Sequence, residues 1–552
     1  MRLCSADLNR WLKKTCVMVA VYGVILSCSV PRPAADTNAP VAPSVLENEG
    51  RKTAVKTTRS DAREDQTTSE LQGSEGPIEL TVEDAILLSI ERNLSLTVER
   101  LNPSIFRTFE DQERAVFDPD LTGAFSYFAE KAPLSEIAAS GDPDVESGRS
   151  DLDLGASQFF PTGTTVGANL SNIRRWSDLY SDRYASRLGL SVTQALLQGR
   201  GLDVNLADLR QAELDTRFSQ YELRGFIEAL VAEVEKTYWD YALSQRQIQI
   251  VEASLEVATQ QLQETEEIIA VGRMAETEVA AAQSEIALRR QNLIDARSLM
   301  ATTRLRLLRL LNPPSLNLWN QDLLLLNQPA VPEIKLDDVA PHVEVALRMR
   351  PDLNQARLGV LRNDLEIVKT KNGLLPRLDL FINLGKTGYS DSFGGSVSDI
   401  SKDGYDLLAG VRFEYPPRNR DARARRERAD VRREQAAEAL ENLAQLVQLD
   451  VRSAYIETNR AKEQIYATAA TRQFQEESLR IETEKFRVGR STNLLVAQAQ
   501  RDLLSSQISE IRAVVTYLKA LVDLHRLEGS LLERRGIVAP GRESVSLPTQ
   551  LR

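Results

Sequence analysis

The sequence predicts a mostly α-helical protein with a smaller β part, in which one plan occurs twice. Val271-Gly272-Arg273 returns as Val488-Gly489-Arg490, 217 positions later, and a similar helical segment follows each. Upstream pairs such as Pro119 and Pro376 lie 257 positions apart, so the first half is 40 residues longer. Both halves contain very long stretches without proline. A tandem repeat of long helices is typical of a scaffold or conduit rather than of a catalytic pocket.

Composition argues against an enzyme and against a nucleic-acid binder. The 552 residues carry a net charge of −11, whereas nucleic-acid binding requires a basic face. The only histidines are His342 and His525, so no His/Cys metal cluster and no Ser-His-Asp triad is evident. No glycine-rich phosphate loop occurs either. We therefore predict no catalytic residue, no cofactor and no metal site.

The N-terminus predicts export. Basic residues precede an apolar run from Cys16 to Leu26, which is too short to span a bilayer as a helix. Residues 1–27 are therefore a predicted signal peptide. Ile25-Leu26-Ser27-Cys28 resembles a bacterial lipobox with Cys28 as the lipidated residue, although Leu26 stands where a small residue is more usual. An ordinary cleaved signal is the alternative.

Further boundaries follow from composition. Residues 28–76 are rich in Pro, Ser, Thr and charge, which predicts a disordered tether. We expect a first repeat at 77–312, a connecting segment at 313–337, a second repeat at 338–532 and a loose tail at 533–552. No later segment has 18 consecutive apolar residues, so no transmembrane helix is expected.

The first repeat begins with a predicted helix from Thr81 to Val116, capped by Thr81 and kinked or divided at Pro103. Alternating side chains predict a strand at 121–129, a hairpin at 152–170 and a strand at 184–196. Residues 202–271 then lack proline and predict one helix of roughly 100 Å at 1.5 Å per residue. A second helix, at 276–311, runs back.

The second repeat has the same plan with fewer strands. It contains a predicted helix at 338–371, strands at 378–385 and 406–415, and long helices at 419–488 and 492–527. One chain thus offers four to six strands. Because the smallest membrane barrels have eight strands and lipid does not tolerate an open edge, a membrane location requires a homo-oligomer.

Between about residues 78 and 532 the chain resembles TolC-type outer-membrane efflux proteins, the outer-membrane factors. The resemblance rests on the duplicated plan, the Val-Gly-Arg turns, Pro119 and Pro376 before strands, and a strand-to-helix junction at 192–201. It implies duplicated long-helix hairpins forming a trimeric α-barrel tunnel, plus a shared transmembrane β-barrel of 12 strands. The 152–170 hairpin departs from the family's two strands per half, and it either adds strands to the barrel or lies outside it.

The resemblance also implies a function. The protein would be the passive outer-membrane exit duct of a tripartite efflux or type I secretion system. Its partners would be a periplasmic adaptor, an inner-membrane pump and outer-membrane lipid. The alternative is a periplasmic coiled-coil scaffold without a pore. The sequence leaves the exported substrate and the pump class open.

The same resemblance assigns candidate site residues. Val271, Gly272 and Arg273, with Val488, Gly489 and Arg490, would form the tips that contact the adaptor and open on docking; simple turns are the alternative. Leu495 and Gln498 stand where the family places acidic gate residues. Leu495 is therefore either an apolar gate or part of a coiled-coil core, and we hypothesise that Glu278 pairs with Arg490 to hold the closed state.

An arginine-rich stretch at 418–433 carries the strongest positive charge. It is either a solvated helix face or a contact for lipid phosphates.

Overall fold

The computed structural model of the chain describes residues 78–132, 145–178, 180–272, 275–312, 319, 322–332, 336–402 and 404–547. The chain divides into two units, Met1–Ala54 and Val55–Arg552, and all described residues belong to the second. The predicted signal peptide, the tether and Cys28 therefore lie outside the described residues. Within the described part, no helix is both long enough and apolar enough to cross a membrane.

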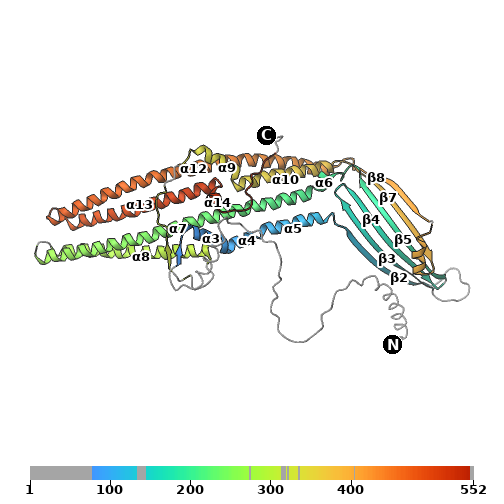
Figure 1. The fold of residues 1–552 in the computed structure, drawn as a ribbon, viewed down its shortest axis with the longest axis horizontal. Coiled ribbons are helices and arrows are strands. Elements are labelled where there is room, and N and C mark those ends of the chain that lie inside the picture. The colour runs from blue at the N-terminus through green and yellow to red at the C-terminus, as the bar shows by residue number, and fades with distance from the viewer. Residues whose placement is uncertain are drawn as a thin grey trace, which may run out of the picture. The chain divides into compact units, whose positions relative to one another are not determined.

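Each half contains short helices, then strands, then a pair of long helices that forms a hairpin (Figure 1). The first half has β1 (Ile78–Leu80), α3 (Val82–Arg92), α4 (Leu94–Glu99), α5 (Asn102–Ala115), α6 (Leu202–Asn205), α7 (Ala207–Ala270) and α8 (Thr277–Leu311). The second has β6 (Leu323–Leu325), α9 (Val339–Met349), α10 (Pro351–Gly373), α11 (Phe393–Asp399), α12 (Arg420–Arg487), α13 (Asn493–Leu527) and α14 (Leu531–Arg534). The four predicted long helices are confirmed as α7, α8, α12 and α13.

The predicted helix from Thr81 to Val116 is divided into three helices; the division near Pro103 was one of the expected outcomes, and the break at Asn93 was not expected. Thr81 does cap α3 with Asp84, as expected. The chain then leaves the helical region at Asn93, whose ψ is 118°. Asn93 ends α3 by donating its backbone N–H to Ser89, and it caps α4 by accepting the N–H of Leu96. Pro103 produces no kink, because it lies in the first turn of α5, where proline is tolerated.

The predicted helix at 338–371 is also interrupted. Arg350 has a ψ of 125° and separates α9 from α10. The next residue is Pro351, and the proline ring disfavours the helical conformation of the residue before it. The proline then starts α10, since its missing N–H is not needed in the first helical turn.

A six-stranded antiparallel sheet lies at the end of α5, α6 and α10, opposite the α7–α8 turn (Figure 1). Its strands are β2 (Asp120–Ala132), β3 (Val145–Phe160), β4 (Thr164–Ser177), β5 (Tyr180–Ala195), β7 (Arg377–Ser390) and β8 (Asp406–Glu414). They follow in the order β2-β3-β4-β5-β7-β8. The hairpin predicted at 152–170 is thus the longer β3–β4 hairpin, and it lies inside the sheet.

The main core forms where α7 crosses the small parallel sheet of β1 and β6. Tyr238 of α7 is fully buried there. Its hydroxyl donates to the backbone oxygen of Leu80 at 3.0 Å and accepts from the backbone N–H of Asn327 at 3.2 Å. One buried hydroxyl therefore ties the long helix to the start of the first repeat and to the connecting segment that follows it.

The loose tail predicted at 533–552 was wrong for its described part. Ile537, Ala539 and Val545 are buried, and the N–H of Val545 donates to the Asn354 side chain at 2.9 Å. Arg535 pairs with the buried carboxylate of Glu235 on α7. The short apolar side chains bury against α7 and α10, so residues 533–547 pack onto the helices.

His525, near the end of α13, is expected to make the free energy of unfolding depend on pH. Burial, helped by the charge of Arg534, lowers the pKa of His525 to about 4 from an ordinary 6.5. Between about pH 6.5 and pH 4, His525 binds a proton in the unfolded chain but not in the folded chain. The free energy of unfolding therefore falls as the pH drops through this range. We expect His525→Gln to remove a loss of about 2 kcal/mol between pH 7 and pH 5. Urea unfolding of the two proteins at both pH values measures this, and equal losses would contradict it.

Candidate functional site

The two tips have the same backbone geometry. Val271 and Val488 end α7 and α12 with φ/ψ of −89°/9° and −93°/10°. In the second tip, Gly489 donates its N–H to the Phe486 oxygen at 2.9 Å, and Arg490 donates to the Lys485 oxygen at 2.8 Å. This pair of bonds is a Schellman motif, which satisfies the last helical carbonyls. The first tip has the matching bond from Gly272 to Ile269, at 2.8 Å, and its Arg273 lies outside the described residues.

Both tip positions need glycine because of their positive backbone φ, and not because a larger side chain would clash with a neighbour. Gly272 and Gly489 have φ values of 71° and 73°, which disfavour other L-residues. A Cβ built on either glycine meets no atom within 4 Å. The neighbouring Val271 and Val488 are 69% and 68% exposed. The tips are thus rigid turns that present apolar side chains outward.

The predicted gate residues lie close to the second tip, at the start of α13. Leu495 is 47% exposed and Gln498 is exposed, so Leu495 does not belong to the core of its own hairpin. Glu278 is half-buried on α8. Among the described residues no ion pair joins Glu278 to Arg490, and Ser491 instead donates to Glu482 of its own hairpin at 2.8 Å. The structure therefore does not bring the hypothesised pair together.

Three ion pairs join the α7–α8 hairpin to the α12–α13 hairpin within the described residues. Two of them, Lys236–Asp523 at 2.5 Å and Lys519–Asp240 at 2.8 Å, lie far from the tips. The third joins Arg501 of α13 to Glu285 of α8 at 2.8 Å, only about three helical turns from the tips. Within the part of the chain that the structure describes, this is the one ion pair that joins the two hairpins near their tips.

That contact belongs to a group of three charges, Glu285, Arg289 and Arg501, here called the Glu285 cluster, in which Glu285 and Arg289 are buried and the Arg501 side chain is 39% exposed. Glu285 also forms an ion pair with Arg289, which lies one turn further along α8. The distance from Arg289 Nη2 to Glu285 Oε1 is 2.6 Å. The Arg289 side chain is only 1% exposed. Burial lowers the pKa of Arg289 from its ordinary value, and the attraction of Glu285 opposes this shift. One carboxylate therefore lies between two cations, and the three groups together keep one positive charge.

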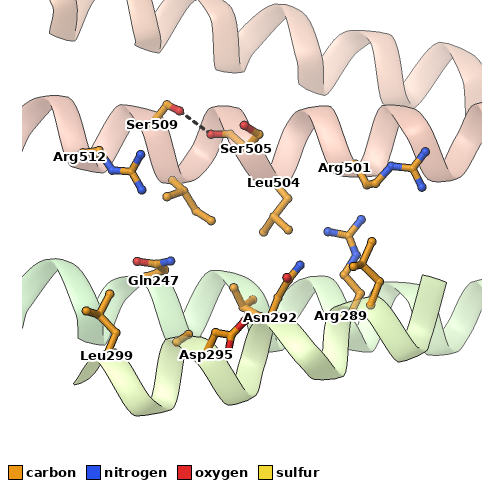
Figure 2. A pocket seen from close by; sticks show the side chains of 14 residues that line it. Gln247, Arg289, Asn292, Asp295, Leu299, Arg501, Leu504, Ser505, Ser509 and Arg512 are labelled. Atoms are coloured by element: carbon orange, nitrogen blue, oxygen red, sulfur yellow. Dashed lines mark hydrogen bonds between the residues drawn. The ribbon is translucent and has the colours of Figure 1, made fainter. Parts of the chain in front are cut away.

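A cavity of about 460 Å³ opens beside the Glu285 cluster, between α7 and α8 on one side and α13 on the other. Figure 2 shows Arg289 directed from the first hairpin toward the second, with Arg501 and Leu504 on the opposite wall. Its other wall positions include Asn292, Ser505 and Arg512. The two hairpins therefore do not pack fully against each other beside the Glu285 cluster.

Our reading of the sequence missed the Glu285 cluster. A signal did exist, because buried positions of α8 recur every seven residues at Ala282, Arg289, Ala296 and Thr303. An arginine in such a stripe, with an acid four residues before it, indicates a buried ion pair. The partner on α13 could not be identified, since Arg501 follows no pattern of its own.

One face of the six-stranded sheet is apolar and exposed. Successive residues along each strand point to opposite faces of the sheet, so residues two apart share a face. One face carries a band of leucine, isoleucine, valine and phenylalanine. Its exposed members are Leu121, Phe125, Leu154, Val166, Leu170, Leu188, Leu190, Val192, Leu380, Ile382, Leu384, Leu407, Val411 and Phe413. An exposed apolar surface of this extent marks contact with lipid or protein.

The family model for outer membrane efflux proteins matches residues 140–313 and 343–530, which is more than half of the chain. The chain belongs to the outer membrane efflux protein family. The family places the protein in the outer membrane, as predicted, and its members are channel proteins rather than enzymes. No curated protein matches the sequence.

Several solved outer-membrane channels have a similar fold. The outer-membrane channel OprN has a TM-score of 0.59 at 18% identity, and the match covers 81% of this chain and 90% of that chain. The CmeC channel of Campylobacter jejuni has a TM-score of 0.59 at 14% identity, covering 90% and 94%. The open state of the MtrE channel of Neisseria gonorrhoeae has a TM-score of 0.59 at 17% identity, covering 82% and 89%. These similarities confirm the predicted combination of long helices and a sheet.

The arginine-rich stretch lies at the start of α12, directly after β8. Some of its charges have protein partners: Arg433 pairs with Asp364 of α10 at 3.2 Å, and Arg426 pairs with Asp430 at 2.8 Å. Part of the stretch therefore serves to pack α12 against α10. Arg428 and Arg432 are exposed on α12, about two to three turns after the start of the helix.

Proposed function

We propose that three copies of this chain form a passive exit duct through the outer membrane, continued into the periplasm by the long helices. The observation that carries the proposal is the sheet. Its apolar face is exposed, and its outer strands β2 and β8 each have one unpaired edge among the described residues. Unpaired backbone edges are not tolerated in lipid, so the edges of neighbouring copies must pair and close a shared transmembrane β-barrel.

The hairpins supply the periplasmic part of the duct. Helices of 64 and 68 residues bury apolar stripes by packing against neighbours, and three copies would supply the walls of an α-barrel tunnel. A periplasmic adaptor would dock at the two tips, and an inner-membrane pump would drive transport. This arrangement belongs to a tripartite efflux or type I secretion system.

Docking would open the tips by separating the two hairpins. Leu495, exposed in the single chain, would meet its copies around the axis and close the duct by excluding water. The Glu285 cluster would hold each protomer's hairpins together in the closed state. Arg490 and Glu278 would lie near the separating ends of the two hairpins without forming an ion pair between them.

Single-channel conductance of the detergent-extracted trimer in planar bilayers tests the duct. We expect discrete openings that favour cations, because the chain is acidic overall. We also expect Leu495→Ser to raise the fraction of time spent open, since it removes the apolar gate. A folded trimer that never conducts, even with Leu495→Ser, would instead favour a periplasmic scaffold without a pore.

A further inference from the structure

We propose that the β3–β4 hairpin is part of the membrane wall, so that three copies close a barrel of eighteen strands. This rests on the proposed function and departs from the 12-stranded barrel that the resemblance implies. The described part of the chain forms one continuous antiparallel sheet of six strands, in which β3 and β4 lie between β2 and β5. A hairpin outside the wall would instead leave β2 and β5 paired with each other.

The hairpin carries the same apolar face as the other strands. In the register of the sheet, Gly123, Leu154, Leu170 and Leu188 form one row across β2, β3, β4 and β5. The neighbouring row is Leu121, Ala156, Ala168, Leu190, Leu384 and Leu407, which crosses all six strands. The apolar band therefore continues through the hairpin in these two rows, while Lys386 of β7 follows Leu188 in the first row and Gln158 and Asn172 bound the band on β3 and β4.

The opposite face of the hairpin is polar. Asp151 and Asp153 of β3 lie beside Ile173 and Ser171 of β4, and Asn169 follows on the same face. Arg149 pairs with Asp151 at 2.6 Å. A strand pair that is apolar on one face and charged on the other fits a wall between lipid and a water-filled lumen.

The hairpin also supplies an aromatic residue where an interfacial belt is expected. Trp176 of β4 stacks on Tyr127 of β2, with ring centroids 6.4 Å apart and planes 19° apart. The indole reaches across β3 because the intervening residue is Gly148, where a Cβ would lie 2.4 Å from the ring. Both rings lie beyond the leucine rows, toward the end of the strands remote from the helices. Tryptophan and tyrosine concentrate at the membrane–water interface.

Both ends of the hairpin are fixed to the rest of the chain. At the helix end, Gly163 accepts the N–H of Ala195 at 2.9 Å, and Asn205 of α6 donates to Pro161 at 2.9 Å. At the other end, the buried Asn172 of β4 donates to Ser186 of β5 at 2.7 Å. Ser396 of α11 lies against the same pair. The second repeat thus packs on the hairpin and holds it in the sheet.

A wider exit follows from the strand number. Barrel diameter grows roughly linearly with the number of strands, so eighteen strands give about 1.5 times the diameter of twelve. The outer-membrane part of the duct would then admit bulkier cargo than a 12-stranded barrel. The size limit for transport would lie at the tips, near Leu495, rather than in the membrane.

Single cysteines on adjacent residues test where the hairpin lies. Cys28 is the only native cysteine after the predicted signal peptide, so the unsubstituted protein gives the background. Leu154→Cys and Leu170→Cys lie on the apolar face, and Asp153→Cys and Ser171→Cys on the polar face. Leu384→Cys and Asn383→Cys on β7 are the matched references. In outer membranes, we expect a charged maleimide to label positions 153, 171 and 383 at least tenfold faster than 154, 170 and 384.

The outcomes separate the two proposals. Fast labelling at 154 and 170 with protection at 384 would overturn the eighteen-stranded barrel and leave the channel standing. Fast labelling at 384 as well would contradict the membrane sheet itself.

Deletion of Val145–Ser177 gives an independent measurement. It leaves β2 and β5 antiparallel, so a barrel of four strands per chain can still close. We expect the membrane part to narrow by about one third in electron micrographs of trimers viewed along their axis. An unchanged diameter would overturn the proposal. If the shortened chain does not fold, the labelling of the full chain still decides.

Discussion

Replacing Gly272 and Gly489 together by leucine is expected to abolish adaptor-dependent export while the trimer still assembles. Each leucine must adopt a φ near 70°, which costs roughly 1–2 kcal/mol per residue. That cost falls on exposed turns and not on the buried helix faces that hold the protein together. A Cβ at either position meets no atom within 4 Å, so the added side chains have room to project into the space that an approaching adaptor would need.

Gly536 provides the matched control. It has a φ of 68°, it is exposed, and a Cβ there also meets no atom within 4 Å. Gly536→Leu therefore carries the same backbone strain at a place that is not a tip. Export of a pump substrate by cells carrying each variant measures the effect, and native gel migration reports the trimer. Equal export by the tip variant and the Gly536 variant would argue against docking at the tips.

The helices and strands could be predicted from sequence because their patterns are local. The absence of proline and the return of Val-Gly-Arg located the turns of both hairpins correctly. The errors arose where a single side chain outweighs the pattern. Asn93 caps two helices at once, and Pro351 changes the backbone of Arg350, although the apolar spacing continues through both. The tail was misjudged because a few scattered apolar residues, such as Ile537, bury against helices far away in sequence.

Site prediction reached its limit at contacts between the hairpins. The tip residues followed from the repeat itself. The pairing of Glu278 with Arg490 was inferred by matching positions, and the structure places the charged tie deeper, at Glu285. Which face of α8 meets which face of α13 depends on how two coiled pairs pack, and no local pattern encodes that. The β3–β4 hairpin was visible as an insertion, yet its place in the sheet depends on pairing with β2 and β5.

Replacing Glu285 by glutamine is expected to make the closed duct leak. The substitution removes the carboxylate that pairs with both Arg289 and Arg501. Arg289 is 1% exposed, and a buried charge without its partner costs about 3–5 kcal/mol. That cost can be relieved when the hairpins separate and water reaches the guanidinium group. At about 1.4 kcal/mol per factor of ten, the closed-to-open ratio should fall by at least one hundredfold.

Open probability in planar bilayers and entry of a bulky antibiotic into intact cells both measure the leak. The matched control is Glu252→Gln, which removes an ion pair between Glu252 and Arg297 within the first hairpin. The N–O distance of that pair is 2.9 Å, similar to the 2.8 Å of Glu285–Arg501. Those side chains are 46% and 63% exposed, and such surface pairs contribute about 0–1 kcal/mol. An equal effect of the two substitutions would show that the Glu285 cluster has no special part in closure.

A third variant separates an uncompensated charge from lost contact area. Methionine at 285, 289 and 501 together removes all three charges and keeps side chains of similar length. Replacing a complete buried ion cluster by apolar residues is often neutral or stabilising, whereas removing one partner is not. The triple variant should therefore close as well as the native protein, although it carries more substitutions than Glu285→Gln. If it leaks as much as the single variant, the hairpins are held by the specific geometry of the ion pairs and not by the balance of buried charge.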